Sequence, residues 1–318
     1  MFIAHDETGG NVTASEAVKN RKYFCPVCLE RVVLKSGNVK THHFSHHRIV
    51  DCIRHLYKKE SLAHLSAKHE LYLTLSRNHK VTMEYYLAEI EQIPDLLVGK
   101  RAIEIQYSAI SPMLIIERSK GYHTLGMDVI WLLDEMALRV NGIHVIPTHF
   151  QLSTQFHGAL FTYQGTNRQL KKWVLHHHIG AGRWLFSVED MDAEALLSEH
   201  NLTPHQTHKM NEQDIKRLIQ HERRQKSRLN PTLTYIYQLG LNPNDLPKHL
   251  LYITESERWI MNSPLEWKLY LMYVLERGGF TIDGFRRFIR LREIQGTPQS
   301  EQVIHRLLID YKTLYNSQ

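Results

Sequence analysis

The chain has 318 residues, of which 42% are hydrophobic, and it carries a formal net charge of +6. This length and composition are sufficient for two or three domains with packed cores. No apolar run approaches the roughly 18 residues that span a membrane, and the N-terminal segment lacks the regions of a secretory signal, so we expect a cytoplasmic protein.

Two close pairs of metal-binding residue types stand in the N-terminal segment. Cys25 and Cys28 form a Cys-x2-Cys pair, and His43 and His46 follow after fourteen residues. Zinc takes four such ligands in a tetrahedron, which two pairs on opposite sides of a β-hairpin supply. A slip of one residue within the histidine cluster stays open, as does Cys52 as a substitute ligand. A redox pair is disfavoured because no βαβ unit surrounds the cysteines. We predict a structural zinc site.

The expected elements change in character along the chain. In order, they are a hairpin strand at 31–35, a helix at 56–76, strands at 81–89, 96–98 and 102–107, a helix at 112–121, and a strand at 126–133. Periodicity of 3.6 residues indicates the first helix, and Pro112 stands in a first turn, where proline is tolerated. Beyond a mixed stretch, residues 189–318 indicate helices separated by prolines. We predict a zinc-binding module at 1–55, an α/β domain at 56–140 and a mainly helical domain at 141–318.

Two acids accompany the apolar strands of the α/β domain. Glu104 and Gln106 share one face of the strand at 102–107, and Asp95 precedes the neighbouring strand. A buried carboxylate is expensive unless it is compensated, and a divalent cation with oxygen ligands would offset that cost. Such a cation also activates water for attack on a phosphodiester. An edge strand with solvated carboxylates is the alternative, and the spacing by itself leaves both open.

The two helices of this domain carry further candidate residues. Glu60 and His64 lie one turn apart on the first helix, where they can face the sheet. Arg118 and Tyr122 lie one turn apart on the second helix, where they could hold a phosphate or a carboxylate, and we predict that they contact DNA. Each pair is also compatible with a purely structural role.

A basic cluster stands in the C-terminal region. Arg286, Arg287 and Arg290 surround a short helix that also carries Phe285 and Phe288. Arginines that follow a phosphate backbone, with aromatic stacking, bind single strands without sequence preference. The alternative is a solvated helix face over an apolar core, and the two phenylalanines are more typical of that core. We predict DNA contacts at the three arginines.

Together these motifs resemble the CoiA competence-protein family. The resemblance spans about residues 1–135 and rests on Tyr23-Phe24-Cys25-Pro26-Val27-Cys28, His43-Phe44-Ser45-His46, Glu60-Ser61-x2-His64-x3-Lys68, Pro94-Asp95-Leu96-Leu97, Ala102-Ile103-Glu104-Ile105-Gln106-x-Ser108-x2-Ser111, Arg118-x3-Tyr122 and Ile130-Trp131-Leu132-Leu133.

This resemblance implies a zinc-finger-like N-terminal module and a nuclease-like domain of the PD-(D/E)xK type with an αβββαβ core. By position, Asp95 and Glu104 would hold a catalytic Mg²⁺ or Mn²⁺ ion, and Glu60 would be the acid on the helix. Gln106 stands where such nucleases usually carry lysine, and a glutamine positions water without supplying charge. Two hypotheses follow for a role in natural transformation. One is a nuclease on single-stranded or branched DNA, and the other is a non-catalytic DNA-binding mediator that works with the recombinase RecA.

Overall fold

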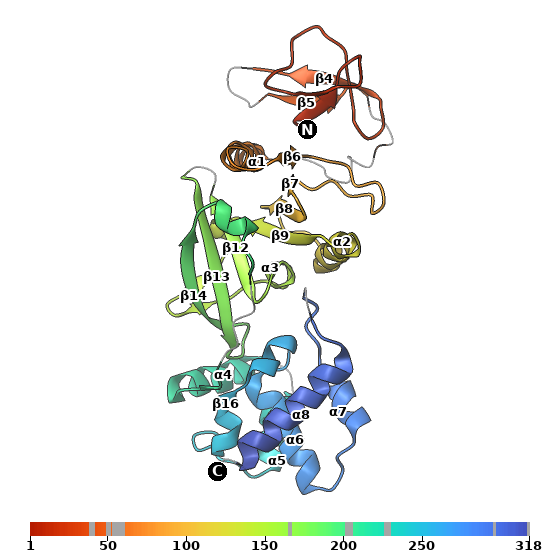
Figure 1. The fold of residues 1–318 in the computed structure, drawn as a ribbon. Coiled ribbons are helices and arrows are strands. Elements are labelled where there is room, and N and C mark those ends of the chain that lie inside the picture. The colour runs from red at the N-terminus through yellow and green to blue at the C-terminus, as the bar shows by residue number, and fades with distance from the viewer. Residues whose placement is uncertain are drawn as a thin grey trace. The chain divides into compact units, whose positions relative to one another are not determined.

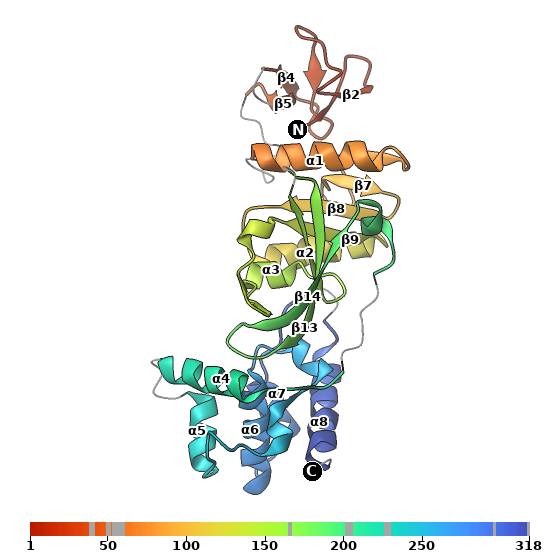
Figure 2. The same ribbon diagram turned by 90° about the vertical axis from the view of Figure 1, so that its left-hand side faces the viewer.

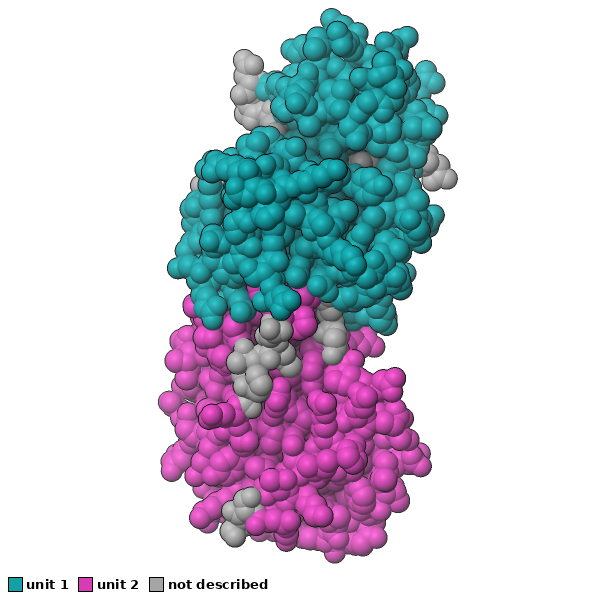
Figure 3. Space-filling view, viewed as in Figure 1, with its two compact units in different colours: residues 1–137, 160–172, 189–199 teal, residues 138–159, 173–188, 200–318 magenta. Residues whose placement is uncertain are grey.

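The computed structural model describes residues 1–37, 42–48, 52, 61–164, 167–200, 206–225, 230–294 and 297–316. The chain divides into two compact units, coloured separately in Figure 3. Unit 1 comprises residues 1–137, 160–172 and 189–199, and unit 2 comprises residues 138–159, 173–188 and 200–318. The chain therefore enters each unit more than once.

The N-terminal part of unit 1 is a small antiparallel sheet. Its strands follow the order β2–β1–β3–β4–β5. They are β1 (Ile3–His5), β2 (Asn11–Thr13), β3 (Tyr23–Phe24), β4 (Arg31–Lys35) and β5 (His43–His46). The expected pairing of β4 with the histidine-bearing strand is present, with Val33 opposite Ser45. The expected turn after residue 35 lies partly outside the described residues.

The larger part of unit 1 is built on a mixed sheet whose strands run β12–β9–β8–β7–β6. Its elements are α1 (Leu62–Leu75), β6 (Val81–Met83), β7 (Leu96–Val98), β8 (Arg101–Gln106), α2 (Pro112–Thr124), β9 (Asp128–Leu133), the 3-10 helices η2 (Glu135–Ala137) and η3 (Glu194–Leu197), and β12 (Ala159–Gln164). Strands β6, β7 and β8 are antiparallel, and β8, β9 and β12 are parallel. The helix, three-strand, helix, strand order expected from the sequence is observed.

Helices cover both faces of the central strands. Strands β8 and β9 are buried along almost their whole length, as expected for strands with helices on both sides. Figures 1 and 2 show α1 on one side of these strands and α2 on the other. Helix α1 begins after Ser61, whose side chain accepts a hydrogen bond from the backbone of His64, a capping contact typically worth about 1 kcal/mol. The first expected strand ends early because Glu84 adopts a left-handed φ of 52°.

Unit 2 combines a short strand group with helices, and its strands run β10–β11–β14–β13. Its elements are β10 (Val140–Asn141), β11 (His144–Val145), α3 (His149–Ser153), β13 (Gln169–His178), β14 (Trp184–Met191), β15 (His208–Lys209), α4 (Glu212–Arg224), α5 (Pro231–Gln238), η4 (Lys248–Leu251), β16 (Tyr252–Ile253), η5 (Glu255–Trp259), α6 (Pro264–Glu276), α7 (Ile282–Phe288) and α8 (Ser300–Asn316). Strands β12, β13 and β14 contribute residues to both units.

The sequence correctly predicted a mixed α/β protein with a helical C-terminal region. Helices α5 and α6 begin at prolines, as expected from the proline-separated pattern. In the part of the chain that the structure describes, every helix is too short or too polar to cross a bilayer.

Candidate functional site

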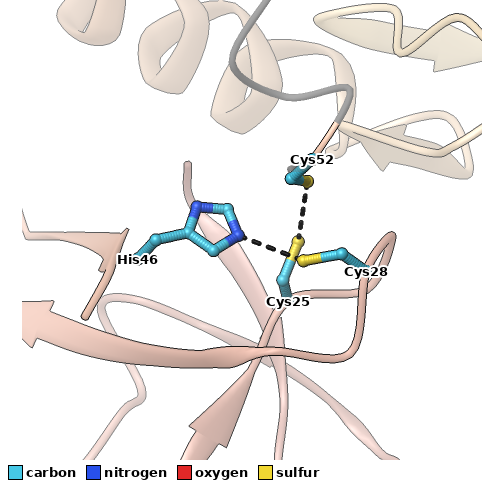
Figure 4. A group of neighbouring side chains, drawn as sticks. All are labelled: Cys25, Cys28, His46 and Cys52. Carbon is cyan, nitrogen blue, oxygen red and sulfur yellow. Dashed lines mark hydrogen bonds between the residues drawn. The ribbon is translucent and has the colours of Figure 1, made fainter. Parts of the chain in front are cut away.

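Four potential metal ligands meet at the end of the N-terminal sheet. The ligand atoms of Cys25, Cys28, His46 and Cys52 all lie within 4.8 Å of one another (Figure 4). The Sγ atoms of Cys25 and Cys52 are 4.0 Å apart, and Cys28 Sγ lies 3.3 Å from His46 Nε2. Three thiols and one imidazole form a donor set that suits zinc. Burial raises the pKa of the Cys28 thiol to about 12, so a cation would be needed to stabilise its thiolate. The cluster can therefore bind a metal such as zinc.

The ligand set differs from the predicted one at one position. His43 is not part of the cluster, and Cys52 takes its place. His43 and His46 are three residues apart in β5, and side chains at that spacing in a strand point to opposite faces. A His-x2-His pair on a strand therefore cannot direct both rings at one ion. The fourth ligand comes instead from the chain that leads toward α1.

Three carboxylates lie in register across neighbouring strands of unit 1. Leu96 of β7 pairs with Met83 of β6 on one side and with Ile103 of β8 on the other. The next position along this row brings together Glu84, Asp95 and Glu104. All three residues are buried, with relative exposures of 4% to 7%. The two acids expected from the sequence, Asp95 and Glu104, are thus neighbours. The third acid, Glu84, was not anticipated.

Lys68 of α1 compensates two of these acids. Its ammonium group lies 2.9 Å from Glu84 Oε1 and 2.9 Å from Asp95 Oδ1, and only 1% of its side chain is exposed. His64 Nε2 lies 3.2 Å from Asp95 Oδ1, and the backbone N–H of Ile105 donates to Asp95 Oδ2 at 2.8 Å. Burial favours the protonated acid, but Lys68 and His64 outweigh it and hold the pKa of Asp95 well below its ordinary value. Asp95 is therefore an anion in the folded protein.

Glu104 receives its partners from α2. Arg118 and Tyr122 both donate to Glu104 Oε1, and the Arg118 guanidinium lies 4.8 Å from the ring centre of Trp131. Within the described residues, Oε2 of Glu104 has no hydrogen-bond partner. Burial raises the pKa of Glu104 to about 7, because Arg118 offsets only part of the cost and the charge of Asp95 adds to it. The positive charge of Arg118 is therefore not sufficient to keep this carboxylate fully ionised at neutral pH.

The remaining predicted residues of this site have different surroundings. Gln106 donates through Nε2 to the carbonyl oxygen of Ser108 at 2.7 Å and to its hydroxyl at 3.2 Å. Arg118 and Tyr122, predicted to contact DNA, are buried, and the carboxylate that they hold is that of Glu104. They are therefore not available to a phosphate. Glu60 lies outside the described residues.

The C-terminal arginines are partly neutralised by acids of their own unit. Arg286 donates to Asp283 Oδ1 at 2.8 Å, and Arg290 donates to both oxygens of Glu266 at 2.9 and 2.8 Å. Arg287 donates through Nε to the carbonyl oxygen of Asp283 at 3.3 Å. Phe285 is fully buried, as expected for a core residue. The three arginines stay candidates for DNA contacts, with less free charge than the sequence suggests.

Comparison with known proteins gives two matches to family models. Residues 60–225, more than half of the chain, match the nuclease-like domain of the competence protein CoiA, and residues 10–54 match the N-terminal domain of that protein. The competence protein CoiA of Bacillus subtilis (strain 168) is 30% identical over 148 residues. This alignment covers 45% of the present chain and 38% of that relative, well under two thirds of its length. No solved structure matches the chain.

Proposed function

The chain belongs to the CoiA competence-protein family, and we propose that it processes DNA during natural transformation through a divalent-metal-dependent nuclease site at Asp95 and Glu104. The match to a nuclease-like domain covers both residues. The substrate would be single-stranded or branched DNA.

The observation that carries this proposal is the state of Glu104. Its Oε2 atom has no hydrogen-bond partner among the described residues, although only 5% of the side chain is exposed. Asp95 lies next to it in the row of acids and is ionised. Two neighbouring carboxylates with an unused oxygen fit a hard divalent cation, which prefers oxygen ligands and keeps several waters. A bound Mg²⁺ or Mn²⁺ ion would supply water activation and charge stabilisation at a phosphodiester.

Lys68 would take over the charge that Gln106 does not provide. Nucleases of this type usually carry a lysine at the position of Gln106, and that glutamine is bonded to Ser108. Lys68 reaches the same row of acids from α1 and fixes Asp95 as an anion. In the proposed site, Lys68 therefore positions Asp95 and contributes a buried positive charge close to the acids. Its effect on cleavage would act through Asp95.

The proposal is tested by DNA cleavage with purified protein. Asp95→Asn and Glu104→Gln remove charge at nearly constant volume, so both should abolish Mg²⁺- or Mn²⁺-dependent cleavage while the fold and DNA binding persist. Glu117→Gln is the matched control, because Glu117 is an exposed residue of the same helix that carries Arg118. Undiminished cleavage by the Asp95→Asn, Glu104→Gln double variant would exclude this site as the nuclease centre.

A second candidate function is a non-catalytic DNA-binding mediator that works with RecA. The arrangement of Gln106, which is bonded to Ser108 through Nε2, favours this alternative. In that case the wild type shows no metal-dependent cleavage, and binding depends on Arg286 and Arg287 of α7 and on Arg290, which follows that helix. Replacing Arg286, Arg287 and Arg290 with Glu should then weaken single-strand binding for all sequences and reduce its salt dependence. Unchanged affinity would place the binding surface elsewhere.

A further inference from the structure

Unit 2 contains a cavity of about 430 Å³ whose lining includes none of the residues of the proposed nuclease site. This volume lies within the range of small-molecule sites in proteins. The walls come from α3, the β13–β14 turn, the end of α4, the starts of α5 and α6, and the segment after α7. The side chains that bear on its chemistry are His178, Ala181, Asn230, Ser263, Arg290 and Arg292.

Arg292 is a buried cation at the wall of this cavity. Its exposure is 8%, its Nε and Nη2 atoms donate to the carbonyl oxygens of Arg258 and Ile260 at 3.2 and 2.7 Å, and its guanidinium lies 5.1 Å from a ring centre of Trp184. No carboxylate among the described residues forms an ion pair with it. Arg290, in the same wall, does have a counter-ion, because its guanidinium donates to both carboxylate oxygens of Glu266. A buried guanidinium that lacks a counter-ion is costly, and an anionic ligand would supply one.

His178 provides a neutral hydrogen-bonding group at the same wall. The residue is buried, and its ring centre lies 5.3 Å from that of Trp184, the residue over which Arg292 packs. Burial, together with the charges of Arg292 and Arg183, holds the pKa of His178 well below its ordinary value. Within the described part of the chain its ring nitrogens make no hydrogen bond. A neutral imidazole has one N–H donor, which can serve an anion beside the guanidinium.

Two helices also begin at the cavity. Asn230 is the N-cap of α5 and Ser263 is the N-cap of α6, and both residues line it. The start of a helix carries a partial positive charge and favours anions. At α6 this charge is already met by Glu266, whose carboxylate accepts from the backbone N–H of Ser263, whereas the first turn of α5 carries no acid. The two acids of the wall are already engaged, since Glu266 is held by Arg290 and Glu222 accepts a hydrogen bond from Asn230. The groups that lack partners are therefore the ones that attract an anion.

We propose that this cavity binds a phosphate monoester of mononucleotide size, with the phosphate at Arg292 and His178. A guanidinium fork matches the oxygens of a phosphate group, the imidazole N–H adds a further donor, and the start of α5 adds a partial positive charge. The volume exceeds what a single inorganic ion needs, so a nucleoside can occupy the remainder. Two sources share this chemistry, namely a free nucleotide and the 5′-phosphate end of a DNA strand.

The test uses calorimetric titration of the full chain in buffer without added divalent cations, which keeps the proposed magnesium or manganese site out of the measurement and leaves the Cys/His cluster undisturbed. Inorganic phosphate and dAMP should bind, and deoxyadenosine should bind at least about tenfold more weakly than dAMP. A 5′-phosphorylated oligonucleotide is compared with its 5′-hydroxyl counterpart. A difference between these strands assigns the site to DNA ends, and equal affinities with dAMP binding assign it to free nucleotides.

Ala181 offers a matched pair of variants. It lines the cavity at a left-handed φ of 54°, a conformation that Asp and Asn tolerate well. Ala181→Asp places a negative charge in the cavity and should weaken dAMP binding at least about tenfold. Ala181→Asn has nearly the same shape without the charge and should bind like the wild type. Failure of the wild type to bind phosphate and dAMP at millimolar concentration, or equal dAMP affinity in the two variants, would overturn the proposal.

Discussion

Glu104→Gln should remove a pH-dependent loss of stability from the folded protein. Burial raises the pKa of Glu104 from its ordinary value of 4.5 to about 7. Between these values the folded protein retains a proton that the unfolded chain has released, so the stability contributed by the protonated group is present below pH 4.5 and is lost as the pH rises through about 7. At about 1.4 kcal/mol per pH unit, this interval corresponds to about 3 kcal/mol. A glutamine cannot ionise and should not show the loss.

The measurement is urea unfolding followed by circular dichroism in buffer without added divalent cations, at several pH values from 4.5 to 8. Effects of the substitution that do not depend on pH, such as altered bonds to Arg118 and Tyr122, cancel when the difference between variant and wild type is followed across pH. That difference should shift by about 3 kcal/mol in favour of Glu104→Gln. Glu117→Gln, on the exposed surface of α2, should give a flat difference. A difference that stays constant with pH for Glu104→Gln as well would refute the raised pKa of Glu104 in the folded protein.

Two further predictions concern the cluster of Cys25, Cys28, His46 and Cys52 and the buried Lys68. Cys52→Ser should release zinc as completely as Cys25→Ser, whereas His43→Ala should retain about one zinc per chain in elemental analysis. Zinc that stays in the Cys52 variant and leaves the His43 variant would contradict the ligand set. Lys68→Met should lower the free energy of unfolding by about 3–5 kcal/mol, because two buried acids lose their shared cation. Lys120→Met, at an exposed position of α2, should change it by less than about 0.5 kcal/mol, and similar values for both lysines would count against the buried network.

Local patterns in the sequence were sufficient to predict the central elements of unit 1. The 3.6-residue periodicity predicted α1, Ser111-Pro112 predicted the start of α2, and the apolar run before Leu133 predicted β9. The pairing of Asp95 with Glu104 also follows from the sequence, because a two-residue turn at Gly99 and Lys100 fixes the register of β7 and β8.

Long-range contacts were not accessible in the same way. Glu84 lies beside the other acids because of the register in which β6 pairs with β7. Strand β6 ends just before this residue, where the backbone adopts a left-handed conformation. Lys68 reads as an ordinary residue of a helix, and its burial depends on how α1 packs on the sheet. The error at His43 had a signal that could have prevented it, since a spacing of three is incompatible with one face of a strand.

The division of the chain has a consequence for how this protein can be taken apart. The chain passes between the two units after residues 137, 159, 172, 188 and 199. No single cut therefore releases either unit as one continuous polypeptide. A fragment that ends at residue 199 would retain segments of unit 2 with buried side chains such as Leu152 and Leu175, without residues 200–318 of that unit. Exchange of gene segments between relatives should consequently succeed only when matching pieces are replaced together, so that each unit keeps all of its parts from one parent.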